Sequence, residues 1–308
     1  MSKTSEETGE ASYILGIDGG GSKCRAILVS ADGKELLGQG IAGPGNPVRG
    51  MDAAISSILD ATRQALQSAG LAESAMADLV VGAGLAGVNL PQFYTLFRQW
   101  DHPFAEFHLT SDLHIACLGA HSGLDGGVII IGTGSCGQVR SGDRVAEVGG
   151  HGFPHGDNGS GAWMGLQMLR EVLLSMDRIT PDTRLTQALL ESCQCQDQVG
   201  LAQYFTDATP ALYARHAPLV FEWAERGDAC AQAIVDEAAM HISNMTYRLL
   251  EYDPARIALS GGLAGNIRPF LADDVQPRLC EPQAAPEWGA VWFAHQSTSE
   301  GARACDAL

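Results

Sequence analysis

The sequence predicts an α/β protein in which one arrangement of strands and helices occurs twice. Two glycine-rich turns, Asp18 to Ser22 and Gly132 to Ser135, each follow an apolar run that is typical of a buried strand, and each leads into a further strand. Around each turn the strands come first, and strands that alternate with helices follow, which favours a mixed sheet with crossover helices. We therefore expect two α/β units, one around each turn.

The first half is predicted to contain three strands and then strands and helices in alternation. Strands are expected at 13–17, 24–30 and 36–40, a helix at 51–69, a strand at 79–83, a helix at 91–100 and a strand at 106–109. The helix at 51–69 carries its apolar residues on one face, and Gly70 stands where a C-cap glycine belongs. The predicted order is β-β-β-α-β-α-β.

After Asp112 the same order is expected to begin again. A short helix to His121 precedes strands at 128–131, 136–140 and 145–148, residues 158–252 are mostly helical, and a strand at 257–259 and a helix at 288–295 close the chain. In the longest helical stretch the apolar residues recur at helical spacing, as expected of a core-facing stripe. The second half is therefore a repeat of topology with a helical insertion.

Charge and hydropathy exclude several classes of function. The 308 residues include 19 Lys and Arg against 36 Asp and Glu, a formal net charge of −17, which disfavours nucleic acid and anionic membranes as partners. No apolar segment approaches the roughly 20 residues of a spanning helix. Residues 1–11 are polar and lack the apolar stretch of a signal peptide. We expect a cytoplasmic protein with a flexible tail over residues 1–11.

The eight cysteines do not predict a disulfide framework. Several of them sit in apolar runs, where a reduced thiol behaves as a small hydrophobic residue. Cys193 and Cys195 form one close pair, but without a second pair or a histidine nearby in sequence they fall short of a zinc site.

The two glycine-rich turns are candidate phosphate sites. Neither turn is a P-loop or a dinucleotide-binding fingerprint, because both of those motifs begin a helix, whereas these turns join two strands. Glycine turns let backbone N–H groups converge on an anion, and Ser22 and Thr133 add hydroxyl donors. The alternative is an ordinary tight hairpin. Gly261 and Gly262, after the strand at 257–259, are a third candidate, with a plain strand-to-helix turn as the alternative.

Two aspartates are candidates for phosphoryl-transfer chemistry. Asp18 ends the first strand and is placed to hold Mg²⁺ through water, since this ion prefers one or two carboxylates plus phosphate oxygens. A hydrogen-bonded turn aspartate is the alternative. Asp112 lies between a strand and a helix and is the candidate general base. Its alternative role is an N-cap that satisfies the free N–H groups of that helix.

An ordered set of motifs resembles the sugar kinases of the actin and hexokinase ATPase superfamily. Within it the chain is similar to the bacterial glucosamine kinases and the N-acetylglucosamine kinases, which are BadF/BadG-type ATPases. The motifs are Gly16-Ile-Asp-Gly-Gly-Gly-Ser-Lys-Cys-Arg25, Gly84-Leu-Ala-Gly87, Thr110-Ser-Asp-Leu-His-Ile-Ala-Cys-Leu-Gly-Ala-His121, Gly132-Thr-Gly-Ser-Cys-Gly137, Gly149-Gly-His-Gly152 and Gly156-Asp-Asn-Gly-Ser-Gly-Ala162. The resemblance implies two RNase H-like, actin-like ATPase lobes with ATP and sugar in the cleft between them.

The resemblance also implies domain boundaries and an activity. The first lobe would comprise 12–113 and 288–308, with the last helix returning to it, and the second 114–287 with a helical insertion. The implied enzyme transfers the γ-phosphate of ATP, with Mg²⁺, to the 6-hydroxyl of an amino sugar. Glucosamine is slightly preferred over N-acetylglucosamine. The partner is thus a small-molecule amino sugar, and a homodimer is left open.

The implied site residues fall on predicted loops and strand ends. Asp112 is the catalytic base and Asp18 the metal ligand. The expected ATP-binding residues are Gly19, Gly20, Gly21, Ser22, Thr133, Gly134, Ser135, Ala224, Gly261 and Gly262. The expected sugar-binding residues are Asn46, Gly149, Gly150, His151 and Asp157. His151 and Asn158 depart from the residues that relatives carry at these points.

Three other functions are compatible with parts of the sequence. An ATPase that activates 2-hydroxyacyl-CoA dehydratases would share the fold and several of the turns, but those proteins bridge an iron–sulfur cluster with paired cysteines. A sugar-responsive repressor would need a DNA-binding element and basic charge. A purely structural, actin-like filament protein would have no function for Asp112 or for the Gly149-Gly150 loop.

Overall fold

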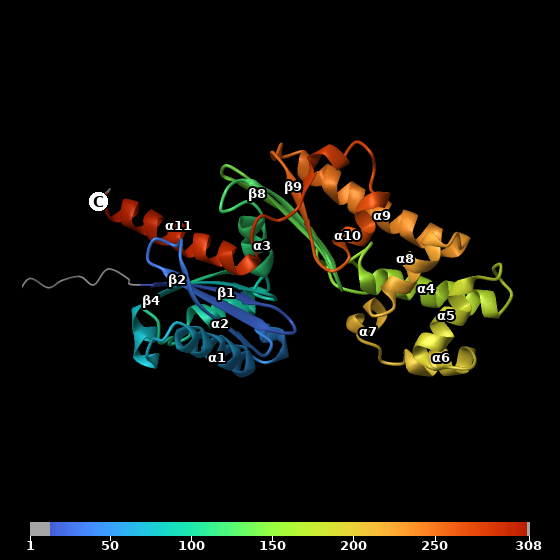
Figure 1. Ribbon diagram of the computed structural model, residues 1–308, viewed down its shortest axis with the longest axis horizontal. Coiled ribbons are helices and arrows are strands. Elements are labelled where there is room, and N and C mark those ends of the chain that lie inside the picture. Colours follow the sequence, from blue (N-terminus) through green and yellow to red (C-terminus); the bar gives the residue numbers. More distant parts are fainter. Residues whose placement is uncertain (1–12, 307–308) are drawn as a thin grey trace, which may run out of the picture. The chain divides into compact units, whose positions relative to one another are not determined.

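The computed structural model describes residues 13–306, and the tail expected at 1–11 lies outside the described residues. The chain forms two compact units (Figure 1). The first comprises Met1–Leu124 and Pro282–Leu308, and the second Asp125–Glu281. Each unit is built on one five-stranded mixed sheet.

The sheet of the first unit has the strand order β3-β2-β1-β4-β5. β1 lies at its centre, antiparallel to β2 and parallel to β4. Because the residues of β4 are all buried, the middle of the sheet is covered on both faces. The strands are β1 (Tyr13–Gly19), β2 (Cys24–Ser30), β3 (Leu36–Ala42), β4 (Leu79–Leu85) and β5 (Glu106–Ser111).

Helices cover both faces of this sheet. They are α1 (Met51–Ser68), α2 (Pro91–Arg98), α3 (Asp112–Ala120) and α11 (Pro286–Asp306). In Figure 1, α1 lies on one side of the sheet and α11 on the other. Glycines let α11 approach closely: a Cβ on Gly16 would lie 2.2 Å from the carbonyl O of Glu287, and one on Gly82 2.0 Å from that of Ala290. The backbone of α11 therefore rests directly on β1 and β4.

The sheet of the second unit repeats this arrangement with the order β10-β9-β6-β7-β8. Its central strand β6 is antiparallel to β7 and parallel to β9, as β1 is to β2 and β4. The strands are β6 (Gly126–Ile131), β7 (Ser135–Ser141), β8 (Arg144–Gly149), β9 (Ile257–Ser260) and β10 (Leu279–Cys280).

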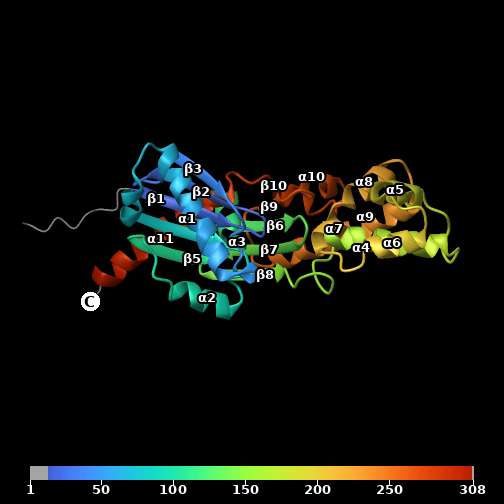
Figure 2. The ribbon, with the colours of Figure 1, turned by 90° about the horizontal axis from the view of Figure 1, so that it is seen from below.

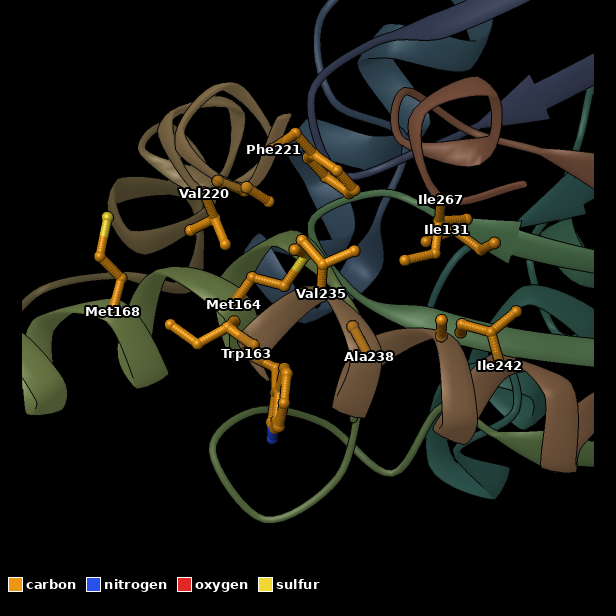
Figure 3. Packing of buried hydrophobic residues seen from close by; sticks show 14 of the residues in the cluster. Ile131, Trp163, Met164, Met168, Val220, Phe221, Val235, Ala238, Ile242 and Ile267 are labelled. Carbon is orange, nitrogen blue, oxygen red and sulfur yellow. The ribbon is translucent and has the colours of Figure 1, made fainter. Parts of the chain in front are cut away.

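The second unit carries most of the helices. They are α4 (Gly161–Met176), α5 (Arg184–Cys193), α6 (Gln198–Tyr204), α7 (Pro210–Ala214), α8 (Ala217–Glu225), α9 (Ala229–Leu250) and α10 (Ala264–Ile267). In Figure 2, α4, α5 and α6 gather beyond one end of this unit's sheet. Figure 3 shows Met164 of α4, Val220 of α8 and Val235 of α9 pointing toward one another in a shared core. α4 thus joins the helical insertion to the sheet.

The α/β class and the repeated topology predicted from the sequence are confirmed. Two details differ. β10 was not predicted, because a strand of two residues leaves too short a pattern. α3 was expected to open the second half, but it belongs to the first unit, which extends to Leu124 and resumes at Pro282. It packs tightly on α11, where a Cβ on Gly289 would lie 1.8 Å from the carbonyl O of Ile115.

Candidate active site

The first glycine-rich turn joins β1 to β2 and is held by neighbouring loops. The N–H of Ala86 donates to the carbonyl of Gly19 (2.9 Å), and the N–H of Gly45 donates to that of Gly20 (3.0 Å). Across the turn, the N–H of Gly20 donates to the carbonyl of Lys23 (2.9 Å). Because these hydrogen bonds use the carbonyl groups of Gly19 and Gly20, contacts within the protein itself hold the turn in its shape.

The tip of this turn is open. A Cβ on Gly21 would have no atom within 4 Å, whereas one on Gly19 would lie 2.3 Å from the side chain of Leu85. Among the described residues, the N–H groups of Gly21 and Ser22 have no hydrogen-bond partner. Free N–H groups at a glycine turn suit an anion. A role for Gly19, Gly20, Gly21 and Ser22 in ATP binding stays a prediction that this geometry supports.

Asp18 sits near the end of β1, on the sheet face that α3 and α11 cover. It is in register with Arg25 on β2 and with Gly84 on β4. A Cβ on Gly84 would lie 2.3 Å from the Ile115 side chain, so α3 packs directly beside it. Arg25 Nη1 lies 3.6 Å from Glu287 Oε1 of α11. Glu287 is buried, and its Oε2 has no hydrogen-bond partner.

Acidic side chains concentrate negative charge around Asp18. Burial is the main reason that the pKa of Asp18 rises to about 7; the carboxylates of Glu287 and Asp112 raise it further, and Arg25 lowers it. A divalent cation would offset this charge and give the orphaned Glu287 Oε2 a partner within its hydration shell.

The residues around Asp18 fit Mg²⁺ only if water and phosphate oxygens supply the rest of its ligands. No cluster of three or more His, Cys, Asp or Glu side chains in the described part of the chain is arranged to hold a metal. Because Mg²⁺ keeps several waters and takes phosphate oxygens besides one or two carboxylates, it does not need such a cluster. Asp18 as its ligand stays a prediction.

Asp112 directly follows β5 and is the first residue of α3. The N-cap of this helix is Ser111, whose Oγ accepts from the N–H of His114 (3.1 Å). The N-cap is therefore Ser111, one residue before Asp112, but the Asp112 carboxylate also engages a free N–H group of the helix, as the alternative expected. Asp112 Oδ1 accepts from the N–H of Leu113 (2.8 Å). Through Gly84 of β4, Asp18 is in register with Thr110 of β5, two strand spacings or about 10 Å away, and Asp112 follows two residues beyond Thr110.

Asn46 has a turn role in the structure. Its Oδ1 accepts from the N–H of Val48 (2.9 Å) and caps the short 3₁₀ helix Pro47–Arg49. A Cβ on Gly87, which has φ +85°, would lie 2.7 Å from the same oxygen. Asn46 Nδ2 has no hydrogen-bond partner among the described residues, so the expected contact with a sugar hydroxyl could use this amide.

The second glycine-rich turn joins β6 to β7 and rests on the start of α4. The N–H of Gly161 donates to the carbonyl of Gly132 (2.8 Å), and the N–H of Ala162 donates to that of Thr133 (3.1 Å). Thr133 is exposed, and its hydroxyl has no partner within the described part of the chain. It is therefore free to donate to a phosphate, as predicted for ATP binding.

The other residues of this turn are engaged within the unit. Ser135 is 2% exposed, and its hydroxyl donates to the carbonyl of Asn158 (2.9 Å). Its N–H donates to the carboxylate of Asp157. A Cβ on Gly134 would lie 2.8 Å from Asp157 Oδ2. The hydroxyl of Ser135 thus stabilises the fold, and a role for Gly134 and Ser135 in ATP binding stays a prediction.

The predicted sugar-binding residues of this unit gather around the same turn. The N–H of Gly150 donates to the carbonyl of Ser135 (2.9 Å), and a Cβ on Gly149 would lie 2.9 Å from that carbonyl. Asp157 has φ +60°. Burial raises the pKa of its carboxyl, while bonds from two backbone N–H groups and the nearby His151 lower it. Gly149, Gly150, His151 and Asp157 therefore lie together, as a shared site requires.

Gly261 and Gly262 join this group from β9. The N–H of Leu263 donates to the carbonyl of Ile131 (3.0 Å), and a Cβ on Gly261, at φ +97°, would lie 2.4 Å from that oxygen. A Cβ on Gly262 would meet nothing within 4 Å. Gly261 is thus needed for the close approach of β9 and β6, and Gly262 leaves open space next to the second turn.

Ala224 lies in a hydrophobic core, and its role in ATP binding stays a prediction. It is 5% exposed and belongs to the hydrophobic core of the helical insertion. The small residue that the structure brings to the second turn is Ala214, at the end of α7. A Cβ on Gly161 would lie 3.1 Å from Ala214 Cβ, 3.1 Å from the carbonyl O of Gly132 and 3.2 Å from the side chain of Leu263.

Sequence reasoning missed Glu287 and Ala214. Neither belongs to a motif, and each reaches its site through packing between elements that are distant in the chain. A buried acid in the first turn of a helix is the one signal that Glu287 offered, and helix starts commonly carry acids.

The Cys193 pair gains a histidine in the folded chain. His216 is buried, and its Nε2 lies 3.8 Å from Cys193 Sγ. Burial raises the pKa of Cys193 to about 11 and lowers that of His216. A buried thiol that stays protonated is a poor metal ligand and nucleophile.

Within the described chain, none of the helices combines the length and the apolar character that crossing a membrane requires. Residues 15–294 match the BadF/BadG/BcrA/BcrD ATPase family, and the chain belongs to this family.

Among individual proteins, the chain is similar to glucosamine kinase GspK of Vibrio cholerae. The two are 36% identical over 282 residues, which cover 92% of this chain and 95% of the relative. A crystal structure of a protein assigned as an N-acetylglucosamine kinase, from Chromobacterium violaceum, aligns with TM-score 0.86 and 31% identity over 93% of this chain and 100% of that one. The ROK hexokinase of Thermus thermophilus, at TM-score 0.52 and 18% identity over 92% of this chain and 97% of that one, shares the fold. The predicted family and the actin-like ATPase fold are confirmed.

Proposed function

We propose that this chain is an ATP-dependent amino-sugar kinase that transfers the γ-phosphate of ATP to the 6-hydroxyl of glucosamine or N-acetylglucosamine. The observation that carries the proposal is the sheet end of the first unit, where Asp18, Asp112 and an open glycine turn come together. The similarity to a glucosamine kinase and to a protein assigned as an N-acetylglucosamine kinase supports the substrate class.

Asp112 is the proposed general base. As the sugar oxygen bonds to the γ-phosphorus, the bond from that phosphorus to the β,γ-bridging oxygen breaks, and ADP leaves. The hydroxyl proton passes to the carboxylate of Asp112. Ser111 is the N-cap of α3, and the N–H of Leu113 donates to Asp112 Oδ1 (2.8 Å), which holds the carboxylate at the start of this helix.

The phosphate groups of ATP are proposed to bind backbone N–H groups and one hydroxyl. The first unit offers the N–H groups of Gly21 and Ser22, and the second offers the Thr133 hydroxyl beside Gly262. Mg²⁺, when bound, would supply charge neutralisation at the phosphates, and Asp18 is the residue proposed to hold it. Asn46, the Gly149-Gly150 backbone, His151 and Asp157 are the proposed partners of the sugar.

A coupled assay of ADP release tests the substrate. Glucosamine and N-acetylglucosamine should support turnover, glucose and N-acetylmannosamine much less, and 6-deoxyglucosamine none. The Asp112→Asn variant serves as the enzyme control. Turnover with 6-deoxyglucosamine at the rate of glucosamine would overturn the choice of the 6-hydroxyl, and no turnover with any amino sugar would overturn the proposed function.

An activator of a redox enzyme is not favoured as the alternative. The relatives that exceed 30% identity in these comparisons are named as sugar kinases.

A further inference from the structure

The helical insertion contains a cavity of about 840 Å³ that none of the candidate site residues lines. Ser175 and Met176, at the end of α4, lie in its wall, whereas the start of α4 binds the second glycine-rich turn through Gly161. α4 has 16 residues, so its two ends are about 24 Å apart at 1.5 Å per residue. The cavity is therefore separate from the residues gathered around Gly132 in the same unit.

Three arginines from three segments line this cavity, which we term the arginine cavity. Arg178 follows α4, Arg184 begins α5 and Arg226 follows α8. Among the described residues, the guanidinium groups of Arg178 and Arg184 have no hydrogen-bond or ion-pair partner. Arg226 Nη2 pairs with Glu222 Oε1 (2.7 Å), and its guanidinium lies 4.9 Å from the Trp223 ring centre. The wall also holds two acids, Asp182 and Asp228, so the positive charge that has no partner is that of Arg178 and Arg184.

Two helix starts lie at the wall of the arginine cavity, where an acid already accepts from their N–H groups. Helices α5 and α9 both begin at its wall, and helix N-termini favour anions. Asp228, an acid in the wall, already accepts from the Thr183 hydroxyl (2.9 Å), from the N–H of Arg184 (2.8 Å) and from that of Ala231 (3.0 Å).

Two further residues of the wall differ in exposure. Thr186 Oγ1 has no hydrogen-bond partner, but it is buried and therefore does not face the cavity. Asp182, the other acid in the wall, is exposed. A ligand with both a phosphate and hydroxyl groups would suit this set, because a carboxylate accepts from hydroxyls and guanidinium groups bind phosphate in a bidentate manner.

We propose that the arginine cavity binds a small phosphate-bearing molecule, with Arg178 and Arg184 on the phosphate oxygens. Trp223, partly buried in the wall, lies beside the bound molecule. Inorganic phosphate and a sugar phosphate share this chemistry. The two differ in the hydroxyl groups that only the sugar phosphate offers to Asp182. The proposal does not depend on the kinase activity.

Fluorine NMR of the full chain labelled with 5-fluorotryptophan tests the proposal at the cavity itself. The Trp223 resonance is identified by its loss in Trp223→Phe. Titration with glucose 6-phosphate, and separately with inorganic phosphate, should shift this resonance in a saturable way. The double variant Arg178→Ala/Arg184→Ala should abolish the shift, and Arg184→Glu should do so alone. Arg170→Ala, an exposed arginine of α4 outside the cavity, is the matched control and should keep it.

The two titrations show which of the two ligands the arginine cavity prefers, and they also give the results that would contradict the proposal. If glucose 6-phosphate binds more tightly than inorganic phosphate, and if this preference weakens in Asp182→Asn, the ligand is a sugar phosphate. If the two bind equally, the ligand is phosphate itself. An unshifted Trp223 resonance at millimolar ligand would overturn the proposal, as would a shift that persists in both arginine variants. Unfolding midpoints of the variants equal to that of the parent chain exclude misfolding as the cause of a lost response.

Discussion

The two glycine-rich turns occupy the same position in two equivalent sheets, yet their surroundings differ. In the first unit, loops around Gly45 and Ala86 hold the turn by its carbonyl groups, and acids lie beside it. In the second, the start of α4 supports the turn, and the carboxylate of Asp157 lies against Gly134. One topology therefore provides a backbone scaffold, and the neighbouring loops decide which chemistry it can serve.

The comparison predicts that the acids of the first unit serve the reaction and those of the second serve binding. Asp112→Asn should lower kcat by roughly 10² to 10⁴, the usual loss when a general base is removed, with little change in KM. Steady-state kinetics with glucosamine checks this. Asp157→Asn should instead raise KM for the sugar more than it lowers kcat.

Asp101→Asn, an exposed acid between α2 and β5, is the control for both variants. Near-parental kcat in Asp112→Asn would remove that residue from the role of base.

Gly261, which follows β9 beside the second turn, and Gly19 of the first turn should differ in the stability lost on replacement. Gly261→Ala should destabilise the chain by roughly 2 to 5 kcal/mol, because a Cβ at φ +97° would lie 2.4 Å from a backbone carbonyl that cannot move aside. Gly19→Ala should cost less, since the nearest atom there is the end of the Leu85 side chain. Denaturant unfolding measures both.

Gly262→Ala is the matched control, because a Cβ there meets nothing within 4 Å. Equal midpoints for Gly261→Ala and Gly262→Ala would contradict the close approach of β9 to β6.

The charge around Asp18 should make the stability of the first unit depend on pH. The folded pKa of Asp18, about 7, lies above its unfolded value. Its contribution is therefore fully present below about pH 4 and is lost as the pH rises through 7. In buffer without Mg²⁺, Asp18→Asn should stabilise the chain by roughly 2 to 4 kcal/mol at pH 8 and by far less at pH 4. Urea unfolding at both values is the measurement, with Asp101→Asn as control.

Replacing the serines that end the two turns should give the smallest expected difference in stability between the two units. Ser135→Ala should cost roughly 1 to 2 kcal/mol of stability, because it removes the hydrogen bond that the buried Ser135 hydroxyl donates to the carbonyl of Asn158. Ser22→Ala should be within about 0.5 kcal/mol of the parent, since Ser22 is exposed. Thermal unfolding compares the two, and equal losses would show that the turns are supported alike.

Local pattern was enough for most of the fold. Strand β2 begins and ends at the predicted residues, Cys24 and Ser30, because alternation and flanking turns are properties of the segment itself. The repeated strand order followed from the two glycine turns. What could not be predicted was the membership of α3, which depends on its packing against a helix near the far end of the sequence.

In the candidate site, too, local sequence pattern predicted the motif residues but not the residues that tertiary packing brings to them. The motifs identified Asp18, Asp112 and the glycine turns, since these residues stand at strand ends whatever packs on them. The sequence did not place Glu287 beside Asp18, nor Ala214 beside the second turn. Those positions are set by helix packing, for which a single sequence carries no spacing rule.

The docking of α11 on β1 and β4 has a consequence for biosynthesis. A ribosome makes the whole second unit before the helix that covers one face of the first sheet. Until then Ile14 and Val80, which pack against Val291 in the finished protein, remain uncovered. The nascent first unit thus exposes an apolar surface during most of translation, which is the stage at which a chaperone would protect it.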